Sequence, residues 1–123
     1  GRAVKRIAVV EDNPDNRLLV RALLSDLFAL TEYETGPAAL AGIRAARPDL
    51  VLLDVSLPGM DGPDVLKHIR ADPTTAGLPV VALSAHAMAG DEARFLGLGF
   101  DGYVAKPIVD EAQLLAAIRR HLP

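Results

Sequence analysis

Four short apolar runs of this chain each end in polar side chains of kinds that do chemistry. In chain order these polar residues are Glu11 with Asp12, Asp54, Ser84 and Lys106. Three carboxylates brought close together repel each other, and proteins resolve that repulsion by protonation or with a bound cation. A set of oxygen ligands favours a hard ion such as Mg²⁺, which keeps several waters and binds through few protein ligands. If the runs are neighbouring strands, their ends would form one acidic site that binds Mg²⁺.

The same residue types suit phosphoryl transfer. With Mg²⁺ bound and the ammonium of Lys106 nearby, the charges of the three carboxylates are cancelled and the site can accept an anionic group. Asp54 can act as an oxygen nucleophile, as carboxylates do in aspartyl-phosphate enzymes. The cation, Lys106 and the hydroxyl of Ser84 could each contact one oxygen of the transferring group. The sequence therefore predicts phosphoryl transfer to Asp54.

The apolar runs have the form of buried parallel strands. Most are continuous in Val, Ile, Leu and Ala, as expected when both faces of a sheet are covered. The expected strands are residues 5–10, 30–34, 49–53, 79–83 and 100–105. The second is more polar and is expected at an edge. Right-handed crossovers then favour the order 2-1-3-4-5, a three-layer, flavodoxin-like (βα)5 α/β fold with a doubly wound parallel sheet.

Stretches of helical period lie between the predicted strands. The first helix is expected to bury a face made of Leu18, Leu19, Ala22, Leu23 and Leu27. Asp15 or Asn16 is its expected N-cap. The second helix is expected at residues 37–46, and the third runs through Val65 to Ile69 and ends before Pro73.

The last two helices are also read from apolar spacing. The fourth is expected to contain Gly90 and to end at Gly99. Its apolar residues are Met88, Phe95, Leu96 and Leu98. The fifth is expected to pack through Leu114, Ile118 and Leu122.

Length and composition restrict the classes of function. We expect one domain over residues 1–123, with residues 1–4 as an expression remnant or a frayed end. A formal net charge of −3 without basic runs argues against direct nucleic-acid binding. The absence of cysteine fits a reducing compartment, and no apolar stretch is long enough for a signal peptide or a membrane span. We therefore expect a cytoplasmic protein with no membrane contact.

The motifs at the strand ends resemble those of the receiver domains of two-component response regulators, over essentially the whole chain. The matching segments are Val10-Glu11-Asp12-Asn13-Pro14, Asp54 followed by Leu57-Pro58-Gly59-Met60-Asp61-Gly62, Ala82-Leu83-Ser84-Ala85 and Tyr103-Val104-Ala105-Lys106-Pro107. Each segment alone is a weak signal, whereas all four in order form a specific one. The resemblance implies a signalling switch rather than an enzyme, which assists only its own phosphorylation and dephosphorylation. It would be a stand-alone receiver or part of a larger regulator or hybrid kinase.

The resemblance also implies roles for the acidic residues. Asp54 would accept a phosphoryl group from a histidine kinase or a histidine phosphotransfer protein. Asp12, Asp54 and the backbone carbonyl of Ser56 would bind Mg²⁺, and Glu11 would act through a water. Ser56 would in addition influence the lifetime of the phosphoryl group, as would His86.

A conformational switch is implied in the same way. Lys106 and Ser84 would contact the phosphoryl group, and Tyr103 would turn inward as Ser84 moves. The fourth helix, fifth strand and fifth helix would form the face that binds a downstream protein partner. The bond between Lys106 and Pro107 would be cis.

Two other functions stay open on the sequence. A phosphatase of the haloacid dehalogenase type also uses an Asp nucleophile, but it would carry Asp-x-Asp-x-Thr where Ser56 stands two residues after Asp54. Turnover of p-nitrophenyl phosphate would identify it. A flavodoxin-like domain for a small ligand would offer Gly, Ser or Thr donors where Glu11 and Asp12 stand. A yellow colour of the purified protein would identify a flavin.

Overall fold

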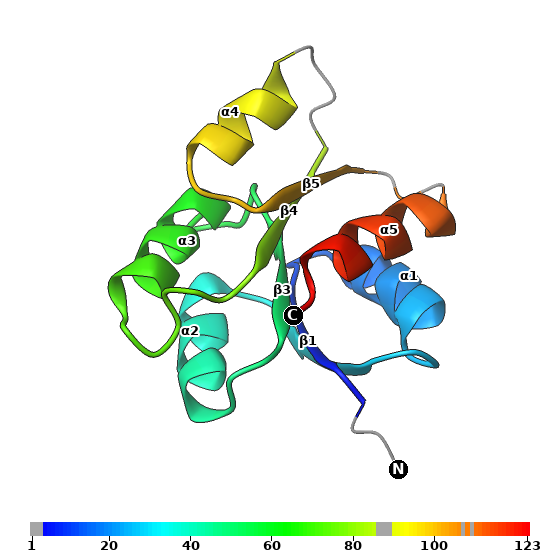
Figure 1. Cartoon of the computed structure of the whole chain (residues 1–123), viewed down its shortest axis with the longest axis horizontal. Coiled ribbons are helices and arrows are strands. Elements are labelled where there is room, and N and C mark those ends of the chain that lie inside the picture. Colours follow the sequence, from blue (N-terminus) through cyan, green and yellow to red (C-terminus); the bar gives the residue numbers. More distant parts are fainter. Residues whose placement is uncertain (1–3, 86–89, 107, 109) are drawn as a thin grey trace.

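Five parallel strands form one sheet in the order β2-β1-β3-β4-β5 in the computed structural model, which describes residues 4–85, 90–106, 108 and 110–123 (Figure 1). The strands are β1 (Arg6–Val10), β2 (Ala29–Tyr33), β3 (Leu50–Asp54), β4 (Val80–Ser84) and β5 (Gly102–Ala105). The predicted strand order and the edge position of β2 are confirmed. Each strand begins and ends within two residues of its predicted bounds.

Helices cover both faces of the sheet. Within the described residues they are α1 (Pro14–Leu24), α2 (Gly36–Ala45), α3 (Gly62–Ala71), α4 (Asp91–Gly97) and α5 (Glu111–His121). In Figure 1, α1 and α5 lie on one side of the strands and α2 and α3 on the other. This is the predicted three-layer, doubly wound arrangement.

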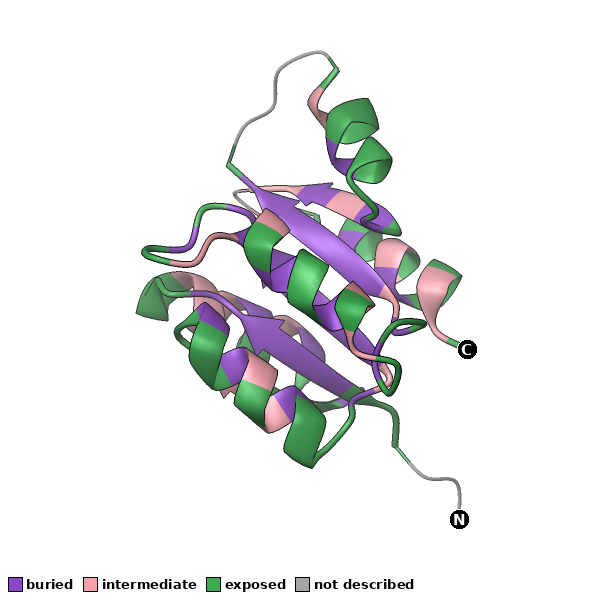
Figure 2. Ribbon diagram, turned by 90° about the vertical axis from the view of Figure 1, so that its left-hand side faces the viewer, coloured by how far each residue is buried: buried purple, intermediate pink, exposed green. Residues whose placement is uncertain are grey.

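Alternate residues along each strand point to opposite layers. In β1, Ile7 and Val9 pack into the cluster under α1 and α5, whereas Ala8 and Val10 pack into the cluster under α2 and α3. All residues of β3 and β4 are buried. In Figure 2 these strands lie as a buried band between helices whose outer faces are exposed. Because neither face of β3 and β4 meets water, these two strands are continuously apolar until the site begins.

The start of α1 differs from the prediction. Asn13, and neither Asp15 nor Asn16, is the N-cap. Its side-chain oxygen accepts hydrogen bonds from the backbone amides of Asp15 at 2.8 Å and of Asn16 at 3.3 Å. Pro14 takes the first helical position, where the missing N–H would have had no partner in any case. The connection from β1 to α1 is therefore only three residues long.

The buried face of α1 differs as well. Val20 and Leu24 are fully buried, whereas Leu18 and Leu27 are 58% and 44% exposed. The helix is rich enough in apolar residues that two overlapping stripes satisfy the helical period. Its orientation on the sheet selects one of them, and Leu27 lies beyond the last helical residue.

The fourth helix begins later than predicted. Gly90 caps α4 rather than lying inside it, with a φ of 92° that glycine adopts without strain. Phe95 is buried, whereas Leu96 and Leu98, whose apolar spacing also indicated the helix, are exposed. Gly99 follows the helix with a φ of 112°, as a left-handed terminator should.

The fifth helix agrees with its prediction. Leu114 and Ile118 are buried, and Leu122 packs against the same cluster. In the part of the chain that the structure describes, no helix combines the length and the apolar character that crossing a membrane requires.

The close approach of α3 to the sheet at Gly62 predicts a stability difference between two glycines. A Cβ atom on Gly62 would lie 2.6 Å from the carbonyl oxygen of Asp54 and 2.5 Å from the Cα of Val55, whereas one on Gly97 would meet open space. We expect Gly62→Ala to lower the free energy of unfolding by about 2 kcal/mol because backbone must move. Gly97→Ala is the control and should raise it by about 0.5 kcal/mol. Urea unfolding measures both, and a Gly62→Ala protein as stable as the parent would contradict the packing described.

Candidate functional site

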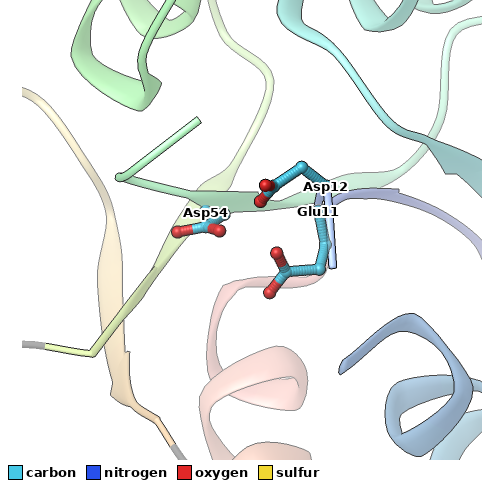
Figure 3. A group of neighbouring side chains, drawn as sticks. All are labelled: Glu11, Asp12 and Asp54. Atoms are coloured by element: carbon cyan, nitrogen blue, oxygen red, sulfur yellow. The ribbon is translucent and has the colours of Figure 1, made fainter. Parts of the chain in front are cut away.

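Three carboxylates from two adjacent strands converge at the carboxyl edge of the sheet. Val10 is paired with Leu53, so the residues that follow β1 lie beside the end of β3. Glu11, Asp12 and Asp54 each offer an oxygen within 4.8 Å of the others. Figure 3 shows the three carboxylates directed toward a common space. The side chains meet where the strand order predicts.

The three carboxylates differ in their access to water. Glu11 and Asp54 are 0% and 2% exposed, whereas Asp12 is exposed. Two buried oxygen donors and one at the surface suit a hard divalent cation, which binds through few protein ligands and retains waters. The donor set therefore fits the predicted cation.

Lys106 supplies the positive charge of the site. It directly follows β5, and its backbone amide donates to the carbonyl oxygen of Ser84 at 2.7 Å. Its Nζ atom lies 2.8 Å from Oε1 of Glu11 and 3.1 Å from Oδ2 of Asp54. The ammonium thus bridges both buried carboxylates. One positive charge among three carboxylates leaves room for the charge of a cation.

Residues at the start of α1 hold the carboxylate of Glu11. The backbone amide of Asn13 donates to Oε2 at 3.2 Å, and Nδ2 of Asn16 donates to Oε1 at 3.1 Å. From the sequence, Asn16 is a candidate cap only, and neither residue is predicted to belong to the site. The two asparagines are visible in the sequence, but their contacts with Glu11 can be inferred only once the first residue of the helix is known.

Asp54 is fixed by its own loop and by Lys106. Its Oδ1 atom accepts a hydrogen bond from the backbone amide of Ser56 at 2.9 Å. The amide of Val55 donates to the carbonyl oxygen of Leu83 at 3.0 Å, which carries the β3–β4 pairing one residue beyond the strand. The carboxylate therefore stands on a rigid base, and the side chain of Ser56 remains exposed.

The pKa values of the two buried carboxyl groups are shifted in opposite directions. Burial raises the pKa of Glu11 to about 7, with Asp54 adding to the rise and Lys106 and the amide of Asn13 opposing it. Burial also acts to raise the pKa of Asp54, but hydrogen bonds with Glu11, the Ser56 amide and Lys106 outweigh it and hold that pKa below its usual range. In the metal-free protein at neutral pH, Asp54 is thus the more fully ionised member of the pair.

Lys106 stays charged in this environment. Burial acts to lower the pKa of Lys106, but its hydrogen bonds and charge interactions with Glu11 and Asp54 outweigh that cost and raise it. The ammonium is therefore a permanent part of the site at neutral pH.

Ser84 and Tyr103 lie around the same edge. Ser84 ends β4 and is fully buried, and the register pairs Asp54 with Leu83, so Ser84 lies one position further out. Tyr103 lies on β5 and is half-buried, with its ring stacked on Phe95 of α4 at 5.9 Å between centroids.

Three residues considered in the sequence analysis, His86, Met88 and Pro107, lie outside the described residues. The influence of His86 on phosphoryl lifetime and the cis bond before Pro107 therefore stay predictions.

Comparisons of the sequence with known proteins all indicate one family. The family model described as response regulator receiver domain matches residues 7–119. The chain is 44% identical over 117 residues to the sensor protein GacS of Pseudomonas syringae, which covers 92% of this chain and 13% of GacS. It is 40% identical over 115 residues to the response regulator PleD of Caulobacter vibrioides, covering 93% of this chain and 25% of PleD. With the polar-differentiation response regulator DivK of Brucella anthropi it shares 40% identity over 109 residues, 85% of each chain.

Solved structures share the architecture. The receiver domain of the sensor histidine kinase PA1611 from Pseudomonas aeruginosa, crystallised with a magnesium ion coordinated in the active site cleft, is 34% identical with a TM-score of 0.87. That match covers 97% of this chain and 98% of the other. The Vibrio cholerae chemotaxis protein CheY4 is 26% identical with a TM-score of 0.88, covering 98% and 100%.

The raised pKa of Glu11 predicts that binding of Mg²⁺ depends on pH. Below pH 7 the Glu11 carboxyl of the metal-free protein holds a proton, which a cation must displace, so affinity falls as the pH is lowered. We expect binding at pH 6 to be about tenfold weaker than at pH 8, because one proton is displaced. Isothermal titration calorimetry measures the change. Glu11→Gln should bind weakly at both pH values, and an equal pH slope in the two proteins would contradict the assignment to Glu11.

Proposed function

Because this chain belongs to the response regulator receiver domain family, we propose that it is a phosphoacceptor switch in which Asp54 takes up a phosphoryl group in the presence of Mg²⁺. The observation that carries the proposal is the ammonium of Lys106 set between the buried carboxylates of Glu11 and Asp54. Such a group neutralises charge on a transferring phosphoryl group only if it is already in place.

Asp54 is the best nucleophile of the three carboxylates. A carboxylate attacks only when ionised, and the pKa of Asp54 is held low while that of Glu11 is raised to about 7. Glu11 is also enclosed by donors from Asn13, Asn16 and Lys106. In the proposed step a bond forms between a carboxylate oxygen of Asp54 and phosphorus. The phosphorus–nitrogen bond of a phosphohistidine donor breaks, and its electron pair returns to the imidazole nitrogen.

The remaining groups would neutralise and orient the phosphoryl oxygens. Mg²⁺ would be held by Asp12, Asp54 and the backbone carbonyl of Ser56, with Glu11 acting through a water. When bound it supplies positive charge to one phosphoryl oxygen. Lys106 would pair with a second oxygen and the hydroxyl of Ser84 would donate to a third. Ser56, which is exposed beside the site, would influence the lifetime of the product.

Phosphorylation would be read out through Ser84 and Tyr103. A shift of Ser84 toward the phosphoryl group would let Tyr103 turn inward, away from its stacking contact with Phe95. That contact ties Tyr103 to α4, so the face made of α4, β5 and α5 would change for a downstream protein partner. A two-state change of this kind requires a contact that exists in only one state.

The same proposal implies which proteins donate the phosphoryl group and where the switch acts. The donor would be a histidine kinase or a histidine phosphotransfer protein, in keeping with the receiver segments of the sensor proteins that this chain matches. The chain would act in the cytoplasm as a single receiver domain that promotes only its own phosphorylation and dephosphorylation. It would not turn over phosphomonoesters.

The proposal predicts that a small phosphodonor modifies Asp54. With Mg²⁺ and acetyl phosphate, intact-mass spectrometry should detect one added phosphoryl group on the parent protein and none on Asp54→Asn. Asp64→Asn, which changes an exposed carboxylate on α3, is the matched control and should be modified like the parent. An Asp54→Asn protein that still gains the group would rule out Asp54 as the acceptor.

The position of Lys106 predicts a separation of metal binding from response. Lys106→Met removes a cation that competes for the carboxylates of Glu11 and Asp54, so Mg²⁺ should bind as tightly as in the parent or tighter. With beryllofluoride, amide resonances near Ser84 and Tyr103 should shift in the parent and shift little in the variant. A full response of Lys106→Met would show that the ammonium is not needed for the switch.

A further inference from the structure

Arg17, in the first turns of α1, contacts the backbone of the acidic residues Glu11 and Asp12. Its Nη1 atom donates to the carbonyl oxygen of Glu11 at 2.9 Å and to that of Asp12 at 3.0 Å. Its own backbone amide donates to the carbonyl oxygen of Asn13 at 3.1 Å. Three consecutive carbonyls of the β1–α1 connection are therefore bound by one residue.

The guanidinium is itself held by one acidic residue of the edge strand β2 and by a second just after it. Nη2 lies 3.1 Å from Oε1 of Glu34, and Nε lies 3.7 Å from Oε1 of Glu32. The side chain of Arg17 is only 13% exposed. A planar group with several donors in fixed directions can bridge two carbonyls and two carboxylates at once, which a lysine ammonium cannot do.

We propose that Arg17 is a positioning residue for the cation site. The last sheet hydrogen bond of this segment is from the amide of Glu11 to the carbonyl oxygen of Tyr33, at 3.0 Å. Beyond it, the direction of the Asp12 carboxylate depends on the backbone of the connection, whose carbonyls Arg17 fixes. Mg²⁺ demands near-ideal octahedral geometry, so a small rotation of this backbone weakens binding. This inference rests on the proposed function, because it concerns the affinity of the same site for Mg²⁺.

Charge and geometry predict opposite effects of removing Arg17. Without the guanidinium, repulsion of an incoming cation decreases, so electrostatics alone predicts equal or tighter binding of Mg²⁺. Loss of the carbonyl contacts predicts weaker binding, and outer partners of metal ligands typically contribute about tenfold or more in affinity. The sign of the change therefore tells a positioning role from a purely electrostatic one.

Arg21 offers a matched control. It lies one turn further along α1 and binds Glu32 through Nε at 2.8 Å and Nη2 at 2.9 Å. Arg21→Met and Arg17→Met each remove one positive charge that lies beside Glu32. Arg17→Met also removes the bonds to the carbonyls of Glu11 and Asp12.

The test is calorimetric titration of Mg²⁺ into the parent, Arg17→Met, Arg17→Lys and Arg21→Met, with thermal unfolding of each metal-free protein. We expect Arg17→Met to bind about tenfold more weakly, Arg17→Lys to lie between it and the parent, and Arg21→Met to bind like the parent. In metal-free protein, the amide resonances of Asp12 and Asn13 should shift in Arg17→Met and not in Arg21→Met.

Parent-like or tighter binding by Arg17→Met would overturn the positioning role. If Arg17→Met does not fold, parent-like binding by Arg17→Lys would overturn it instead. A parent protein that does not bind Mg²⁺ would overturn the proposed function itself, which separates the two failures.

Discussion

The site depends on one ammonium placed between two buried carboxylates. Glu11 and Asp54 have almost no contact with water, and a buried carboxylate without a partner takes up a proton rather than remain charged. Lys106 reaches both, at 2.8 and 3.1 Å, and together with hydrogen bonds from Glu11 and the Ser56 amide it holds the pKa of Asp54 below its usual range. The carboxylates still outnumber the ammonium, so a divalent cation would neutralise the site further.

The sheet holds these like charges close together. Carboxyl ends of β1 and β3 are adjacent because the strand order places them side by side, and apolar layers on both faces fix their register. The backbone below Asp54 approaches α3 so closely that only glycine fits at position 62. Rigid strands hold like charges in place where a flexible loop would let them separate.

The first turn of α1 serves the helix and the site together. Asn13 caps the helix and also donates to Glu11, while Asn16 and Arg17 reach back to the side chain and the backbone of the acidic pair. A change in this turn would act on both helix stability and cation geometry. On the far side of the site, the ring of Tyr103 on β5 stacks on Phe95, the buried residue of α4. This aromatic contact joins two elements of the proposed output face.

The sequence by itself determined the strands, their order and the identity of the acidic residues. Continuous apolar runs require burial on both faces, and right-handed crossovers then leave few arrangements for five such units. Only the tertiary structure decided the stripe of α1 that faces the core, the exposure of Leu96 and Leu98, and the cap at Asn13. It alone brought Asn16 and Arg17 to Glu11, because contacts between a helix turn and the loop before it have no period in the sequence. Local spacing specifies elements, whereas the direction of a side chain across them is set by how the elements pack.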